Sequence, residues 1–162
     1  HQRERIVTMF NPWADPMGSG YHIIQSQIAI GSAGLAGKGW LRGTQSQLEF
    51  IPERSTDFIF AVYAEEFGLI GATVLIVLYL FVVGRSLVLA YKVEDSYCRL
   101  LVGSLALTFF FYVFVNTAMV TGVLPVVGIP LPLISYGGTS MVTLMAAFGM
   151  IMGACTHRRL MK

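Results

Sequence analysis

Three long apolar runs most strongly limit what this sequence can fold into. Residues 100–124 contain no charged side chain, and residues 58–83 are interrupted only by Glu65 and Glu66. A third run, residues 139–155, is shorter and is followed by a basic tail. Crossing the roughly 30 Å hydrocarbon core of a membrane takes about 20 mainly apolar residues in a helix. The sequence therefore predicts an all-α integral membrane protein, a polytopic helical bundle with a transmembrane helix in each run.

The overall composition supports this prediction and excludes one class of function. Hydrophobic residues make up 55% of the 162 residues, and charged residues make up only 12%, roughly half the usual share. The mean hydropathy is +0.67. The net charge of +2 is scattered, whereas nucleic-acid binding needs a clustered basic face, so we expect no nucleic-acid partner. Cys98 and Cys155 are not spaced like metal ligands, and we expect neither a disulfide nor a metal–thiolate site.

The distribution of Lys and Arg predicts the orientation of the spans. Residues 84–99 and the tail, residues 156–162, are denser in these cations than residues 1–57. Positive residues concentrate in cytoplasmic segments. We therefore predict a cytoplasmic loop at 84–99, a cytoplasmic tail at 156–162, and extracytoplasmic segments at 1–57 and 125–138. The polar start without an initiator Met indicates the C-terminal part of a longer protein.

The predicted outer segment, residues 1–57, is too long to be a plain connector. Within it, Ile24, Ile28 and Leu35 fall on one face of a helix, and glycines lie on both sides. This pattern predicts a short amphipathic or re-entrant helix bracketed by glycine turns. Irregular backbone of this kind is tolerated at membrane depth only against protein or in a wet cavity.

Asp57 lies where a polar strip meets the first apolar run. Local sequence favours a structural role, because helix starts strongly prefer Asp as an N-cap or first-turn acid. The alternative is a carboxylate held at the boundary of water and lipid, where it can accept a proton from an alcohol.

Four further charged residues are candidates for a site. Glu65 and Glu66 fall inside an apolar run, where ionisable groups are costly and usually face a bundle interior or a cavity, so they are cavity-lining candidates. A snorkelling or paired structural role is the equal alternative for them. Lys38 and Arg42 are interleaved with glycines that let a backbone approach a ligand closely. That arrangement suits a phosphate, although Trp with Lys or Arg also serves simply as a membrane-interface anchor.

Two polar features beyond the first span have structural interpretations. Asn116 is the lone strongly polar side chain in the middle of its run, and such residues mostly form hydrogen bonds between helices. The predicted loop 125–138 is rich in proline, glycine and hydroxyl side chains. Its local role is to redirect the chain and to cap the third helix through Thr139 or Ser140.

Several short motifs occur in a fixed order along the chain. They are GYHIIQS at residues 20–26, IAIGS at 28–32, GKGW at 37–40, GTQSQ at 43–47, the stretch from Pro52 to Ala61, Asn116, GVLP at 122–125, GIPLP at 128–132 and SYGGTS at 135–140. Together they resemble the SEDS family, the shape, elongation, division and sporulation proteins of bacterial cell-wall synthesis. GKGW and GTQSQ are more similar to the rod-shape-determining, RodA-type branch than to the division branch. The resemblance covers essentially the whole chain.

The resemblance implies a peptidoglycan glycosyltransferase in the bacterial inner membrane. Such a protein has about ten spans, of which this chain would hold the last three, so the chain alone is expected to be inactive. It would polymerise lipid II, an undecaprenyl-pyrophosphate-linked disaccharide-pentapeptide, during cell elongation. The essential loop aspartate of the family matches Asp57. One departure is Ser55, where many members have His.

The resemblance also implies roles for particular residues. Asp57 would be the general base of an inverting transfer. Lys38, Arg42, Gln45, Glu53, Thr56 and Ser135 are the expected substrate-binding residues. No metal ligand is expected, although a divalent cation, Mg²⁺ or Mn²⁺, would offset pyrophosphate charge in the way common to phosphate-transfer sites.

The expected partners are lipid II, membrane lipids, the elongation machinery and a class B penicillin-binding protein, the transpeptidase. Two alternatives stay open at this point. One is a lipid II flippase that uses Glu65 or Glu66 as polar steps, and the other is a scaffold for the transpeptidase.

Overall fold

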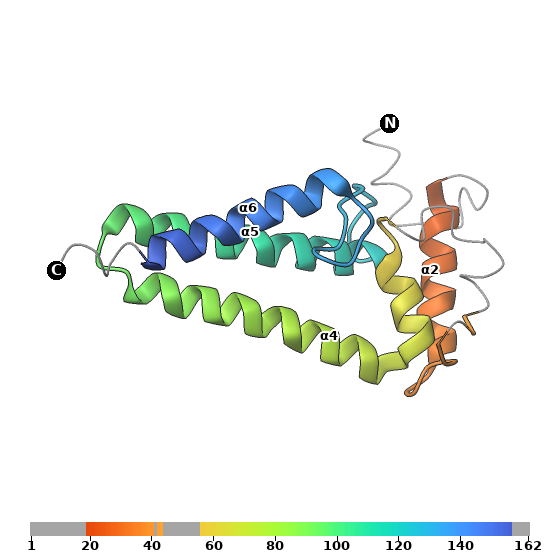
Figure 1. Cartoon of the computed structure of the whole chain (residues 1–162). Coiled ribbons are helices and arrows are strands. Elements are labelled where there is room, and N and C mark those ends of the chain that lie inside the picture. Colours follow the sequence, from red (N-terminus) through yellow and green to blue (C-terminus); the bar gives the residue numbers. More distant parts are fainter. Residues whose placement is uncertain (1–18, 41, 44–55, 157–162) are drawn as a thin grey trace.

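A computed structural model describes residues 19–40, 42–43 and 56–156, and these ranges fold into helices joined by turns and loops. The helices are α2 (Ser19–Ala33), α4 (Ile59–Lys92), α5 (Ser96–Val120) and α6 (Gly138–Thr156). In Figure 1, α4, α5 and α6 form an elongated bundle, and α2 lies across the end where α4 begins. The described part contains no strand, in agreement with the predicted all-α fold.

Two of these helices, α4 and α5, are long and apolar enough to cross a membrane, with mean hydropathies of 2.5 and 2.0 over their best windows. The third predicted span corresponds to α6, which is apolar over Gly138–Ala154 but shorter. Because α6 packs along α5 in the bundle, its apolar side chains are partly covered by protein.

The predicted loop at residues 84–99 is mostly helical. The chain leaves helical structure only at residues 93–95, between α4 and α5. No proline interrupts residues 84–92, so α4 continues past the apolar run. Asp95 is the N-cap of α5 and accepts a 3.0 Å hydrogen bond from the backbone N–H of Cys98. This hydrogen bond holds the pKa of Asp95 below its usual range.

The course of α4 is broken at Gly68, where the backbone has φ 69° and ψ −166°. The segment after α2, residues 34–39, inserts at the break. Backbone N–H groups of Lys38 and Gly39 donate to the carbonyls of Glu65 and Glu66, both at 3.0 Å. The N–H groups beyond the break, on residues 69 and 70, donate back to residues 34 and 35 at 3.1 and 3.2 Å. Each backbone group that the break removes from the helix therefore finds a partner.

Two glycines make this joint possible. A side chain on Gly68 would bring its Cβ within 2.3 Å of the Gly37 nitrogen, and one on Gly37 would reach 2.1 Å from the Glu66 carbonyl oxygen. Gly68 also has a backbone conformation that is essentially restricted to glycine. The two chain segments are thus in direct backbone contact.

The predicted outer helix is present as α2, but Leu35, one of the three residues assigned to its apolar face, lies outside the helix. Of these three residues, only Ile24 is buried, while Ile28 is 44% exposed and Leu35 is 69% exposed. The buried face of α2 contains Ile23 and Ile24 together with small side chains, among them Ser26 and Ala29, which are both 0% exposed. Small residues allow helices in membranes to approach closely, and here they bring α2 against α4 and α5.

Polar bonds fix α2 to the end of α5. The Ser26 hydroxyl donates to the carbonyl oxygen of Val120 at 3.0 Å, and the Gln27 amide donates to that of Thr121 at 3.2 Å. These carbonyls lie at the C-terminal end of α5, where a helix has no N–H donors of its own for its last carbonyls. The outer helix therefore completes the hydrogen bonding of α5.

The loop between α5 and α6 turns back into the bundle. Leu131 and Pro132 are buried. The Tyr79 hydroxyl on α4 donates to the carbonyl oxygen of Pro132 at 2.6 Å. The Tyr79 ring also packs edge-on against Phe109 of α5, with 5.8 Å between ring centroids. The loop is therefore anchored to the bundle rather than lying on its surface.

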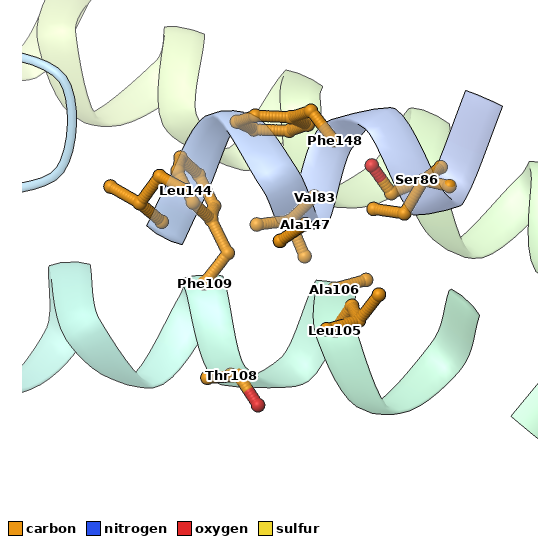
Figure 2. A pocket seen from close by; sticks show the side chains of 10 residues that line it. Val83, Ser86, Leu105, Ala106, Thr108, Phe109, Leu144, Ala147 and Phe148 are labelled. Atoms are coloured by element: carbon orange, nitrogen blue, oxygen red, sulfur yellow. The ribbon is translucent and has the colours of Figure 1, made fainter. Parts of the chain in front are cut away.

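A small apolar cavity of about 40 Å³ lies between α4, α5 and α6 (Figure 2). Val83, Phe109, Ala147 and Phe148 are among the side chains that surround it. Unfilled space of this size forfeits dispersion contacts with the side chains that line it. The cavity marks incomplete packing at the centre of the three-helix bundle.

We expect Gly68→Ala to destabilise the protein by at least about 1–3 kcal/mol, because the backbone conformation is strained for any other residue and the Cβ meets Gly37. The unfolding temperature of the full-length protein in detergent measures this. Gly84→Ala is the matched control, since a Cβ there meets nothing within 4 Å in the described structure. An equal unfolding temperature for the two variants would contradict the proposed need for glycine at the break.

We expect Ala147→Val to stabilise the bundle by up to about 1 kcal/mol, because it fills part of the cavity. The same unfolding measurement applies. Ala146→Val makes the same chemical change at an exposed position and should leave the unfolding temperature nearly unchanged. A lower unfolding temperature for Ala147→Val than for Ala146→Val would show that the cavity does not accept the added methyl groups.

Candidate functional site

Asp57 lies immediately before α4, partly buried beside the α5–α6 loop. The local prediction that it is the N-cap of this helix is wrong. The N-cap is Phe58, whose ring is 1% exposed and which makes no side-chain capping bond. The Phe58 side chain packs in the core and so fixes the chain directly next to Asp57. The carboxylate is therefore placed by the tertiary structure.

Asn116 of α5 holds the backbone of Asp57 in place. Its side-chain nitrogen donates to the carbonyl oxygen of Asp57 at 2.9 Å and to that of Ile129 at 2.6 Å. Asn116 is 0% exposed, and its amide oxygen accepts no hydrogen bond within the described ranges. The expected interhelical role of Asn116 is extended, because one amide joins α5, the start of α4 and the α5–α6 loop.

Ser135 forms a second bond between the loop and the same stretch of chain. Its hydroxyl donates to the carbonyl oxygen of Thr56 at 2.5 Å and accepts from the backbone N–H of Leu131 at 2.7 Å. Ser135 is buried. Thr56 and Ser135, both predicted substrate-binding residues, are thus brought together. The hydroxyl of Ser135 is used in holding the backbone.

The Asp57 carboxylate lies against Gly128 of the loop. A Cβ built on Gly128 would be 3.2 Å from Oδ2 of Asp57, tighter than ordinary contact. Gly128 also has φ +80°, a conformation that favours glycine. The carboxylate therefore faces the backbone of this turn, where Gly128 has no side chain.

Lys38 and Glu65 form a second polar centre at the break in α4. Lys38 Nζ and Glu65 Oε1 are 2.8 Å apart, and the Glu65 side chain is 0% exposed against 25% for Lys38. Glu65, one of the predicted cavity-lining residues, is therefore buried and forms an ion pair. Glu66 is half-buried and its carbonyl accepts the bond from Gly39 described above.

These two centres lie at opposite ends of the first part of α4. Eight residues separate Asp57 from Glu65, about 12 Å by helical rise. The predicted phosphate ligand Lys38 is therefore next to Glu65 and not next to Asp57. Arg42 is exposed and follows a turn closed by a 3.1 Å bond from its N–H to the carbonyl of Gly39. Gln45 and Glu53 lie outside the described residues.

No group of three or more His, Cys, Asp or Glu side chains comes together in the part of the chain that the structure describes. The carboxylates in it, Asp57 and Glu65 included, are dispersed along α4 and the 93–95 connection. These residues do not by themselves form a site that fits a divalent cation.

The whole chain matches a known family of proteins. A family model described as the FtsW/RodA/SpoVE cell cycle proteins matches residues 1–160. The chain belongs to this family. That result confirms the resemblance seen in the motifs.

Named relatives show the same relationship. The chain is 56% identical over 161 residues to the peptidoglycan glycosyltransferase MrdB of Escherichia coli K12, covering 99% of the chain and 44% of that protein. It is 44% identical over 152 residues to the peptidoglycan glycosyltransferase RodA of Treponema pallidum, covering 94% of the chain and 35% of the relative. The chain thus spans less than half the length of these curated relatives.

A solved structure shares the fold. It was described under the heading of structural coordination of polymerization and crosslinking by a peptidoglycan synthase complex. The TM-score is 0.76 at 35% sequence identity, over 98% of this chain and 43% of the other. The described arrangement of helices is therefore one that an experimentally determined relative also has.

Sequence reasoning did not find the residues that hold Asp57. Gly128 appeared only as a member of a motif, Ser135 as an expected substrate-binding residue, and Asn116 as a polar residue in an apolar run. The side chains of Asn116 and Ser135 donate to main-chain carbonyls, which cannot be recognised from residue types. The glycines of these motifs were the available signal in the sequence, because glycine is favoured where a turn needs positive φ or where a backbone approaches another group closely.

We expect Asn116→Asp to destabilise the protein by about 2 kcal/mol, because two partly buried carbonyls lose their donor at constant side-chain volume. Thermal unfolding of the full-length protein gives the measurement. Thr117→Val is a control on the same helix, since it removes only a local bond to the carbonyl of Val113 and should cost far less. Equal losses in the two variants would contradict the anchoring role of Asn116.

Proposed function

We propose that the full-length protein polymerises lipid II into glycan strands, with Asp57 as the general base. Two relatives that match nearly all of this chain are named peptidoglycan glycosyltransferases, one of them at 56% identity. The observation that carries the proposal is the geometry at Asp57. Its backbone is held by Asn116, and its carboxylate lies against the bare backbone of Gly128.

The arrangement of the helices supports a membrane topology for this proposal. The start of α4, α2 and the α5–α6 loop lie together at one end of the bundle, and the 93–95 connection lies at the other, as Figure 1 shows. With α4, α5 and α6 as three spans, residues 1–57 and 125–138 are extracytoplasmic, and the tail is cytoplasmic. This orientation agrees with the Lys and Arg distribution.

The proposed reaction is a single displacement at the anomeric carbon of the donor. The Asp57 carboxylate takes the proton from the 4-hydroxyl of the acceptor N-acetylglucosamine. The hydroxyl oxygen forms its bond to the donor anomeric carbon while the bond from that carbon to the pyrophosphate oxygen breaks. Undecaprenyl pyrophosphate leaves with the bonding electrons, and the α link is inverted to β. A base on a fixed backbone suits this step, since proton transfer requires defined geometry.

Charge on the leaving pyrophosphate calls for a cation. Lys38 already pairs with Glu65, so we assign this role first to Arg42, whose side chain is exposed. The expected Mg²⁺ or Mn²⁺ would need oxygen donors beyond the described carboxylates, and no step is assigned to it.

Partner proteins are part of the same proposal. The solved relative comes from a peptidoglycan synthase complex that combines polymerization with crosslinking. We infer that this protein likewise works with a class B penicillin-binding protein, the transpeptidase, within the elongation machinery. Lipid II would reach the site from the surrounding membrane.

We expect Asp57→Asn to reduce polymerisation of lipid II by at least about 100-fold, because the base is removed while the side-chain volume is kept. Glycan strand formation by the full-length protein in detergent measures this, with the unfolding temperature recorded in parallel. The amide cannot accept the proton, yet the backbone bonds to Asn116 and Ser135 should survive.

Asp95→Asn is the matched control and should retain activity, since Asp95 caps α5 at the opposite end of the bundle. Near-normal polymerisation by Asp57→Asn would overturn the assignment of the base. A wild-type protein that makes no strands in detergent would instead favour the transporter alternative.

A further inference from the structure

The bend of α4 at Gly68 has an alternative geometry that satisfies the same backbone groups. In a continuous helix, the N–H groups of residues 69 and 70 would donate to the carbonyls of Glu65 and Glu66. In the structure, these four groups instead bond to the inserted segment, residues 34–39. If that segment withdrew, α4 could close the two missing bonds by itself. Hydrogen bonding within α4 therefore does not select the bent form.

The Lys38–Glu65 ion pair, in contrast, favours the bent form of α4. Lys38 belongs to the inserted segment and Glu65 to α4, and their charged atoms are 2.8 Å apart. Withdrawal of the segment would take the cation away from a carboxylate that is 0% exposed. Removing one partner of a buried ion pair is strongly unfavourable. The pair thus ties insertion of the segment to the bent shape of α4.

The bend is connected to the site through a short, stiff piece of helix. Residues 59–67 run from Asp57 to the break, and a single helical segment transmits rotation at one end to the other. The far end is fixed by the bond from Asn116 to the Asp57 carbonyl. Straightening of α4 about Gly68 would therefore pull Asp57 away from Gly128 and Asn116.

We propose that Lys38 and Glu65 are positioning residues for Asp57: their buried ion pair keeps α4 bent and thereby holds the carboxylate against the α5–α6 loop. The proposal rests on the proposed role of Asp57 as the base. Lys38 and Glu65 act at a distance from the reacting atoms. Their loss is therefore expected to displace Asp57, whereas loss of a pyrophosphate ligand would remove a contact with the substrate.

The conformational part is tested with spin labels at Val62 and Val77, on either side of the break. The labels are placed in the full-length protein after its native cysteines, including Cys98 and Cys155, are replaced by Ser. Lys38→Met and Glu65→Gln should each lengthen and broaden the measured distance between labels. The double variant, which removes both charges of this pair together, should do the same.

The charge exchange Lys38→Glu with Glu65→Lys should restore the short distance, because it rebuilds the pair with opposite polarity. Lys92→Met with Glu94→Gln makes the same chemical changes at the other end of α4 and should leave the distance unchanged. An unchanged distance in Lys38→Met, Glu65→Gln and the double variant would overturn the proposal, whatever their activity.

The catalytic part is tested on the same variants. Loss of the pair should lower kcat for lipid II polymerisation by about tenfold or more with little change in KM, since a misplaced base slows chemistry rather than binding. The charge exchange should recover much of kcat. A longer label distance with unchanged kcat would overturn the positioning role.

Asp57→Asn separates this proposal from the proposed function. The labelled Asp57→Asn protein should keep the wild-type distance, because the substitution leaves the ion pair intact. Activity retained in Asp57→Asn would refute the base assignment without altering the distances reported by the labels. A changed distance in that variant would contradict control of the bend by the ion pair.

Discussion

The exchange of backbone hydrogen bonds at the break in α4, together with the Lys38–Glu65 ion pair beside it, is the interaction on which the rest of this structure depends. The inserted segment, residues 34–39, supplies two donors and two acceptors where the helix gives up its own. In an apolar surrounding, unsatisfied backbone groups would each cost several kcal/mol. With the exchange in place, α2 is drawn against the bundle and the first part of α4 is directed toward the α5–α6 loop. The position of Asp57 follows from that direction.

Much of the fold could be predicted because it follows from local sequence. An apolar run of span length has few alternatives to a helix, and α4, α5 and α6 each cover most or all of one of the three predicted runs, with α5 ending at Val120, before the predicted end at residue 124. The predictions failed where tertiary contacts decide. Ile28, assigned to the apolar face of the outer helix, is 44% exposed because α2 packs against α4 and α5 through Ile23, Ile24 and small residues such as Ser26 and Ala29. For a local reason, the segment predicted as a loop at 84–99 is largely helical, since no helix breaker stops α4 at the end of the hydrophobic run.

The candidate site could also be predicted only in part, because tertiary contacts hold its residues in place. Asp57 could be singled out because the motifs around it resemble those of a known family, whereas its local sequence favoured a helix cap. The pairing of Lys38 with Glu65 was not predicted, because each appears in the sequence as a lone charge with several possible roles. The bonds made by Asn116 and Ser135 end on carbonyls of residues far away in the chain. Residue identity carries no information about such acceptors.

The anchoring of residues 56 and 57 has a consequence for how this position can change during evolution. The side chains of Asn116 and Ser135 donate hydrogen bonds to the main-chain oxygens of residues 57 and 56. Main-chain oxygens are present whatever the side chain at these positions. Geometry and chemistry are thus encoded by different residues. A substitution at 57 would therefore remove the proposed base while the bonds that hold the backbone remain, so loss of the carboxylate need not cost the fold.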